Sequence, residues 1–255
     1  MSCERLMAFT ATTTRHRPRY VAWSYSKLKN WRDCARRHAE VDLSKKWGQD
    51  GDNEHIDFGN AVHEAMEHRL FRGTPIPAHL QSTLQMNLEG AAGKVLQGDA
   101  TAEAWMKRTG GLLLPEQQLA MTDDFQPAEW MDRTKMVWLR AKIDVAKILG
   151  PVALLYDWKT GKVSDRESDQ LVISAAMIFC HYPQVQKIRT CYVWLKPDAT
   201  TTLDVTREQM PEFWTKILPE VARYTKDVQT SNFPPRPSGL CGWCPVKSCE
   251  HNPKD

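Results

Sequence analysis

Two aspartates and a lysine stand on either side of one turn signal, in segments that are otherwise apolar. Asp144 precedes Gly150-Pro151, and Asp157 and Lys159 follow it. If the dipeptide forms the tip of a hairpin, the numbers of opposite residues sum to 301, so Asp144 faces Asp157, with Cβ atoms about 5 Å apart. Facing carboxylates are unfavourable without a cation, and Lys159 projects from the same strand face as Asp157. The pattern predicts a site for a divalent cation and a positioned water or phosphate.

A simpler interpretation of these residues is one Asp–Lys ion pair beside a solvated aspartate. The pattern Asp-x-Lys is common, and a shift of one residue in the strand register would turn Asp144 to the other face. The symmetry of the two aspartates about the turn favours the metal site.

His63 lies beside the apolar stripe of a predicted helix that begins near Asp57 and carries Val62 and Met66. His68 follows five residues later, about 140° around the helix, so the two imidazoles cannot easily share a metal as they do in zinc proteases. Considered alone, His63 is typical of a surface or core histidine.

Cys241, Cys244 and Cys249 form a C-x2-C-x4-C pattern after a Pro-rich connector. This spacing is typical of metal ligands, and three thiolates need a fourth partner. The nearby His251 would complete a local zinc site. Cys34, in a basic N-terminal helix, would instead give four thiolates, which suit zinc or an iron–sulfur cluster. Ordinary free thiols are the remaining alternative.

The apolar pattern predicts the elements that position these groups. Ser24 and Ser26 are candidate N-caps of a first helix that runs through Ala35. Residues 80–108 are expected to be helical with a break around Gly90–Gly98, after which the apolar period changes from about 3.6 to 2. The later elements expected are strands at Leu112–Met121, Met136–Leu149, Val152–Lys159, Val185–Leu195 and Leu203–Val205. A helix is expected through Gln170 and Phe179 that ends near Pro183, and a last helix over Arg207–Val228. Strands flanked by helices predict an α/β or α+β fold.

Composition limits the class of protein. The 255 residues are 42% hydrophobic and 25% charged, as in a globular protein. No stretch reaches the roughly 18 apolar residues of a membrane span, so no membrane partner is expected. Seven cysteines without a recognisable secretion signal argue against a disulfide framework. We expect Cys180 and Cys191 in the core and Cys3 in a tail.

The net charge of +3 hides an uneven distribution along the chain. Residues 15–46 hold ten Lys or Arg against three acids, whereas residues 47–70 hold six acids against one arginine. The two blocks are either solvated faces that neutralise each other or a phosphate-attracting rim beside a carboxylate site.

Several segments together resemble the RecB-like branch of the PD-(D/E)XK nucleases, including the iron–sulfur exonucleases related to AddB and to the CRISPR-adaptation nucleases. They occur in family order and span nearly the whole chain. The string DWKTGK and the layout of one plus three cysteines are the most specific parts. The matching segments are Ser24–Leu28 with Cys34, Gly59–His63, Ala141–Asp144, Asp157–Lys162, Gln170-Leu171 and Cys241–Cys249.

The resemblance implies a restriction-endonuclease-like core, a mixed central sheet flanked by helices, and roles for single residues. Lys159 would orient the attacking water and stabilise charge on the phosphate, with Gln170 beside it. The implied ligands of Mg²⁺ or Mn²⁺ are His63, Asp144, Asp157 and the backbone carbonyl of Trp158.

The resemblance also implies a [4Fe–4S] cluster that joins the two ends of the chain, with zinc as the alternative. Its implied ligands are Cys34, Cys241, Cys244 and Cys249. Candidate DNA contacts are Arg36, Arg37, Lys162 and Arg166. The chain departs from the family pattern at Ser174, where a tyrosine is frequent, and Glu116 matches a frequent family glutamate to which we give little weight in the metal site.

The implied function is a metal-dependent DNA exonuclease that acts on single strands or duplex ends in recombination, repair or phage DNA processing, beside a helicase or annealing protein. We expect one nuclease domain: a tail at 1–20, a core at 21–230, and a Cys-rich segment at 231–255 that packs on the helix around Cys34. The expected location is the cytoplasm, with an organelle matrix as the alternative. The competing functions are a non-catalytic DNA-binding subunit on a nuclease scaffold and a structural zinc module with an unrelated enzyme attached.

Overall fold

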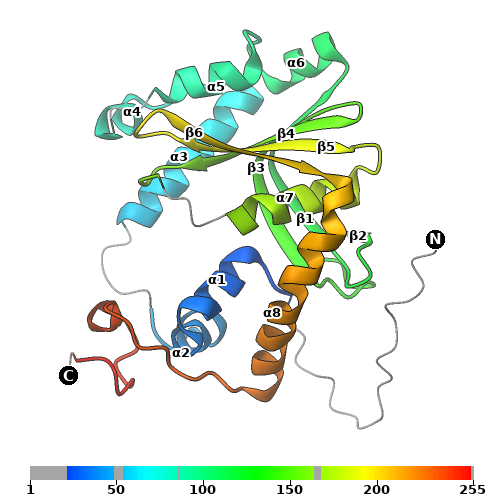
Figure 1. The fold of residues 1–255 in the computed structure, drawn as a ribbon. Helices are drawn as coiled ribbons and strands as arrows, with labels where there is room; N and C mark the ends of the chain where they lie inside the picture. Colours follow the sequence, from blue (N-terminus) through cyan, green and yellow to red (C-terminus); the bar gives the residue numbers. More distant parts are fainter. Residues whose placement is uncertain (1–21, 49–53, 85–86, 164–167, 254–255) are drawn as a thin grey trace.

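The computed structural model describes residues 22–48, 54–84, 87–163 and 168–253 (Figure 1). The predicted tail at 1–20, including Cys3, and the candidate DNA contact Arg166 lie outside these ranges.

A six-stranded mixed sheet forms the centre of the molecule (Figure 1). Its spatial order is β2-β1-β3-β4-β5-β6, and neighbouring strands are antiparallel except for β4 and β5, which are parallel. The strands are β1 (Leu112–Met121), β2 (Pro127–Ala128), β3 (Leu139–Leu149), β4 (Val152–Lys159), β5 (Lys187–Trp194) and β6 (Ala199–Thr206). The predicted mixed sheet of an α+β fold is therefore confirmed.

The helices lie before, between and after the strands. They are α1 (Tyr25–Asp33), α2 (Ala35–Arg37), the π-helix η1 (His38–Leu43), α3 (Glu54–Arg72), α4 (Ala78–Leu84), α5 (Leu88–Leu96), α6 (Ala102–Thr109), α7 (Ser168–His181), the 3₁₀-helix η2 (Arg207–Gln209), α8 (Met210–Thr230) and the 3₁₀-helix η3 (Cys241–Trp243). Within the described part of the chain, none of them is long and apolar enough to cross a membrane.

The sheet separates two apolar cores. On one face α3, α5 and α6 bury Val62, Met66 and Trp105 against β1, β3 and β4. On the other face α7 packs against β1, β3 and β5, and α1 and α8 extend this core around Trp31 and Tyr224 (Figure 1). The end of the chain returns to the region of α2, so residues far apart in sequence lie side by side there.

The predicted hairpin register is confirmed. The β3–β4 ladder runs from Leu149↔Val152 to Val145↔Tyr156, and each pair has numbers that sum to 301. Gly150 adopts a φ of 55°, a left-handed conformation that glycine reaches without a Cβ clash. The turn signal therefore fixed the register of the two strands that carry the aspartates.

The predicted helix break around Gly90–Gly98 is only partly correct, because α5 runs straight through Gly90. The side chain of Asn87 caps this helix by accepting a hydrogen bond from Gly90 N. A Cβ on Gly90 would lie 2.3 Å from the Asn87 amide nitrogen, so this glycine makes room for the cap. The chain leaves the helix at Gln97 and Gly98, whose φ values are 54° and 90°.

The first predicted helix is interrupted at Cys34. Ser24 caps α1 as expected, with its hydroxyl 3.3 Å from Lys27 N. Cys34 then adopts an extended conformation between α1 and α2, with φ of −161° and ψ of 110°. Strand β3 also begins three residues later than predicted, at Leu139, which pairs with Met121 at the end of β1.

Candidate active site

The two aspartates lie where β3 and β4 separate. Their ladder ends at Val145↔Tyr156, so Asp144 and Asp157 would form the next pair in the same register. Asp144 is 8% exposed, and its Oδ2 accepts a hydrogen bond of 2.7 Å from the backbone N–H of Trp158. This contact replaces the next ladder bond and fixes the carboxylate between the strands.

His63 reaches the same point from α3. Its Nδ1 lies 3.3 Å from Asp144 Oδ1, and its Nε2 lies 3.2 Å from the carbonyl oxygen of Trp158. Val62 and Met66 are fully buried on the same helix and hold it against the sheet. The structure thus brings together the imidazole, the carboxylate and the backbone carbonyl that the resemblance grouped.

Glu116 joins this group more closely than the sequence suggested. One of its oxygens lies 3.8 Å from His63 Nδ1, and the other is ion-paired with Lys142. The β1–β3 pairs Pro115↔Val145 and Gln117↔Ile143 flank it, which places Glu116 opposite Asp144. Glu116 itself has a φ of 49°, a conformation that is unfavourable for a residue with a side chain and is often found at functional sites.

A second part of the site surrounds Asp157. The ammonium of Lys159 lies 2.7 Å from Asp157 Oδ1 and donates a hydrogen bond of 3.2 Å to Gln170 Oε1. The Gln170 amide donates to Asp157 Oδ2 at 3.0 Å. Gln170 comes from α7, so the helix on the opposite face of the sheet from α3 completes the site.

The electrostatics of the site indicate an excess of buried negative charge. Burial, together with the charge of Asp144, raises the pKa of Asp157 from 3.8 to about 7. Burial opposes the His63 cation, but hydrogen bonds and charge interactions with Asp144 and Glu116 outweigh it and raise the His63 pKa from 6.5 to about 10. Bound protons therefore relieve part of the repulsion among the carboxylates, and a divalent cation would relieve the same repulsion more strongly.

The donor set fits a hard divalent cation such as Mg²⁺ or Mn²⁺. His63, Glu116 and Asp144 offer ligand atoms that all lie within 4.8 Å of one another. Glu116 Oε2 and Asp157 Oδ1 are buried oxygens, each paired with a lysine ammonium. These oxygens leave lone pairs for a metal to use.

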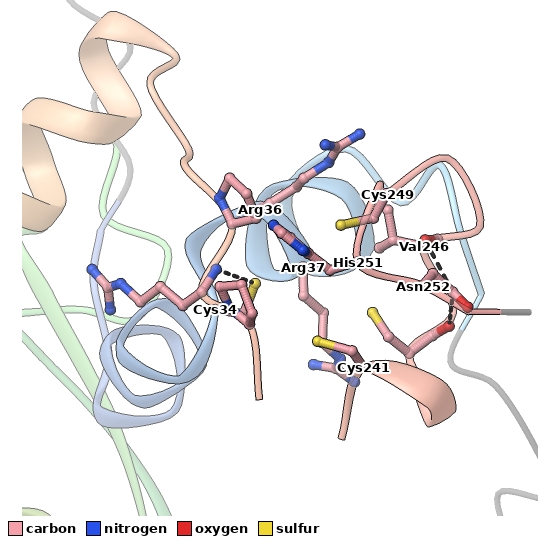
Figure 2. Close-up of a pocket in the computed structure, with 12 residues that line it drawn as sticks. Cys34, Arg36, Arg37, Cys241, Val246, Cys249, His251 and Asn252 are labelled. Carbon is pink, nitrogen blue, oxygen red and sulfur yellow. Dashed lines mark hydrogen bonds between the residues drawn. The ribbon is translucent and has the colours of Figure 1, made fainter. Parts of the chain in front are cut away.

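The four cysteines named by the resemblance line a second pocket, between the α1–α2 break and the C-terminal segment. Figure 2 shows the sulfurs of Cys34, Cys241 and Cys249 turned toward a common space. Backbone N–H groups of Arg236 and Ser238 donate to Cys34 and Cys241 at 3.5 and 3.3 Å. In the described residues, the only group of three candidate ligands within 4.8 Å is the His63 site, so the sulfurs form no tight cluster.

The candidate DNA contacts are dispersed. Arg36 is ion-paired with Glu40 and Glu250, and it also donates to the carbonyl of Ser248, so it binds the C-terminal segment. Arg37 lines the cysteine pocket, and Lys162 is exposed just beyond β4. Cys191 is buried as predicted, and Cys180 is half-buried against the core that α7, α1 and α8 form on one face of the sheet.

Comparison with known proteins places the chain in a family. Residues 22–249 match the family model described as the PD-(D/E)XK nuclease superfamily. Similar solved structures include a candidate exonuclease from Eubacterium rectale, which is 13% identical, covers 88% of this chain and 86% of its own, and gives a TM-score of 0.48. The protein SSO0001 is also 13% identical, covers 94% and 90%, and gives a TM-score of 0.39. No curated protein matches the sequence.

Proposed function

The chain belongs to the PD-(D/E)XK nuclease superfamily, and on this premise we propose that it is a divalent-metal-dependent exonuclease that degrades single-stranded DNA or DNA ends. The contacts at the parting of β3 and β4 support this proposal. Side chains from four different elements meet there: three carboxylates, one imidazole and the ammonium of Lys159. Burying carboxylates this close together is costly unless cations neutralise them, and a bound divalent metal would do so.

The proposed metal ligands are His63, Glu116, Asp144, Asp157 and the carbonyl oxygen of Trp158. Hydrolysis forms a bond from water to phosphorus and breaks the bond to a sugar oxygen, so negative charge accumulates on the phosphate. A bound Mg²⁺ or Mn²⁺ supplies Lewis-acid stabilisation of that charge.

Lys159 orients the attacking water and places its ammonium beside the developing charge. Its ion pair with Asp157 and its hydrogen bond to Gln170 hold that ammonium at the site. Gln170 contacts both Asp157 and Lys159, so it couples the position of the carboxylate to the position of the lysine.

Asp144→Asn tests the proposal directly, because it keeps the shape of the side chain and removes its charge. We expect wild type to degrade end-labelled linear DNA with Mn²⁺ and this variant to be at least about a thousandfold slower, as befits the loss of several kcal/mol of charge stabilisation. Asp204→Asn is the matched control, since Asp204 lies on β6 outside the site, where it is ion-paired with Arg189 of β5.

Closed circular single strands separate exonuclease from endonuclease action, because they offer no end. Degradation of linear DNA with intact circles supports the exonuclease, whereas nicked circles indicate an endonuclease. Equal degradation by wild type and Asp144→Asn would sink the assignment. DNA binding without cleavage under several divalent metals would support the non-catalytic subunit instead.

We also propose that Cys34, Cys241, Cys244 and Cys249 hold a [4Fe–4S] cluster with a structural role. All four cysteines line one pocket, which supports a group shared by their sulfurs. His251 also lines the pocket and is the alternative ligand of a zinc site.

Metal analysis after anaerobic purification tests this second proposal. We expect iron and visible colour in the wild type, and loss of both in Cys34→Ser. Cys191→Ser is the control, because Cys191 is a buried thiol of β5 outside the pocket. Zinc in place of iron, or unchanged metal content in Cys34→Ser, would contradict the four-cysteine cluster.

We propose one nuclease domain, with residues 21–230 as its core and 231–255 fastened to the α1–α2 break through the cysteine pocket. We further propose that it processes DNA in the cytoplasm, in recombination, repair or phage DNA metabolism beside a helicase or annealing protein. Co-purification of a DNA-unwinding or DNA-annealing activity with the tagged chain tests the partner.

A further inference from the structure

Tyr192 lies directly beside the proposed active site. It belongs to β5 and pairs with Asp157 in the parallel β4–β5 ladder. Its side chain is almost fully buried, with 2% of the residue exposed, and contacts the ring of Trp194. No motif of the sequence singles out this tyrosine, because it sits within an ordinary apolar strand.

The hydroxyl of Tyr192 fixes the orientation of Gln170. It donates a hydrogen bond of 3.2 Å to Gln170 Oε1, the same atom that accepts from Lys159. The other end of the amide donates to Asp157 Oδ2. A flipped amide would turn its NH₂ group toward an ammonium and its oxygen toward a carboxylate, so these neighbours allow one orientation only.

The ring of Tyr192 supports Lys159. The Lys159 ammonium lies 4.9 Å from the ring centroid, within the range of a cation–π contact. The lysine is therefore held by three partners that point in different directions: the Asp157 carboxylate, the Gln170 carbonyl oxygen and the Tyr192 ring. A long, flexible side chain needs such contacts to keep its end group in one place.

We propose that Tyr192 is a positioning residue of the nuclease reaction, which holds Lys159 with its ring and Gln170 with its hydroxyl so that both face Asp157. This inference rests on the proposed function for its catalytic consequence. The two halves of the side chain have separate tasks, and two variants separate them. Tyr192→Phe keeps the ring and loses the hydroxyl, whereas Tyr192→Leu loses both.

Steady-state kinetics on linear single-stranded DNA with saturating Mn²⁺ give the first test. We expect Tyr192→Leu to lower kcat by roughly 10- to 100-fold, as for a catalytic group displaced by about 1 Å. Tyr192→Phe should lower kcat by at most about tenfold, the effect of one hydrogen bond. KM should change little in both variants, because Tyr192 is buried and contacts the catalytic side chains.

Tyr224→Phe is the matched control. Tyr224 is as deeply buried, at 1% exposed, and its hydroxyl lies 3.4 Å from His38 Nε2 in the core outside the site. We expect this variant to lose a similar amount of thermal stability and to keep its kcat. If kcat fell equally in Tyr224→Phe and Tyr192→Phe, the loss would reflect stability and the positioning role would be overturned.

The side-chain amide of Gln170 gives a readout that does not depend on activity. Its ¹⁵N-labelled NH₂ signals, assigned by their disappearance in Gln170→Glu, should shift in Tyr192→Phe and Tyr192→Leu and stay in place in Tyr224→Phe. Unmoved signals in Tyr192→Leu would overturn the proposal even if wild type cleaved DNA. A wild type that cleaves no DNA would refute the proposed function, and these signals would then decide the role of Tyr192 alone.

Discussion

The two candidate metal centres of this chain are built in opposite ways. The carboxylate site takes its groups from β1, β3, β4, α3 and α7, so a hydrogen-bonded ladder and two packed helices set their positions. The cysteine pocket takes its groups from a break between two short helices and from a C-terminal segment. Within the described residues 231–253, the one regular element is the three-residue helix η3.

The carboxylate site is also more deeply buried than the segment that carries the last three pocket cysteines. Asp144 and Glu116 lie among buried strands, whereas in residues 231–253 only Pro245, Val246 and Asn252 are buried. The carboxylate site is thus held by the fold, and a cation would complete it. The pocket would instead depend on the group that its four cysteines are proposed to bind. A bound group does for a short loop what a hydrophobic core does for a sheet.

The sharpest test of this contrast is Lys159→Ala. We expect kcat to fall by about 10²- to 10³-fold, since Lys159 is the cation proposed to face the developing charge. The melting temperature should change by only a few degrees, because the strands fix the site without this side chain. Calorimetry measures the stability and a DNA cleavage assay measures kcat. Lys216→Ala is the control, because Lys216 is an exposed lysine of α8 that is ion-paired with Glu212. A collapse of stability would show that the site is not preorganised.

Glu116→Gln tests whether the third carboxylate belongs to the site. The amide keeps the shape of the side chain and removes one charge, so we expect Mn²⁺ to bind about 10- to 100-fold more weakly, as when a ligand or its support is lost. Titration followed by manganese electron paramagnetic resonance gives the affinity. Gln117→Glu is the control, because it changes the charge at the neighbouring residue of β1 and leaves Glu116 intact. An equal change of Mn²⁺ affinity in both variants would exclude a specific role for Glu116.

Metal binding should compete with protons. With the His63 pKa near 10 and the Asp157 pKa near 7, both groups must lose protons before they bind a cation. The apparent Mn²⁺ affinity should therefore fall about tenfold for each pH unit from about pH 10 to 7, and more steeply below pH 7. Calorimetric titrations in buffers of different ionisation enthalpy count the released protons. An affinity that is constant between pH 6 and 8 would contradict this reading.

The smallest expected effect concerns the cysteine pocket. Asn252 donates to the carbonyl oxygens of Cys244 and Val246 at 2.8 and 3.2 Å and thereby ties the loop to itself. We expect Asn252→Ala to cost about 1–3 kcal/mol, because the Cys244 carbonyl loses its Asn252 donor, whereas the Val246 carbonyl keeps the N–H of Cys249. The variant should also lose bound metal to a chelator faster. DNA cleavage by the carboxylate site should stay within about twofold. An Asn252→Ala variant that lost DNA cleavage and kept its metal would contradict the independence of the carboxylate site from the cysteine pocket.

Local signals predicted much of the fold and part of the site. Gly150-Pro151 predicted a hairpin, and a two-stranded register follows from one turn, so Asp144 and Asp157 could be paired by arithmetic. Glu116 could not be weighed in this way, because a long irregular connection separates β1 from β3 and gives no register. The approach of His63 from α3 depends on tertiary packing, and only the resemblance pointed to it.

The cysteine pocket shows the same limit. The spacing of Cys241, Cys244 and Cys249 predicts a metal site, whereas Cys34, their proposed partner, has no spacing signal of its own. A glycine within an apolar helical pattern predicts a break at Gly90, whereas in the structure this residue makes room for the Asn87 cap. No local signal marks Tyr192, because its contacts arise from a parallel ladder that no turn reveals.

The separation of Cys34 from Cys241 by more than 200 residues has a consequence for biosynthesis. At about 5–20 residues per second, roughly 10–40 s pass between the emergence of the first pocket cysteine and the translation of the last three. All six strands lie between Cys34 and Cys241 in the sequence, so they are synthesised before the pocket can close. Closing the pocket therefore joins α1 and α2 to a segment that is synthesised after the whole sheet.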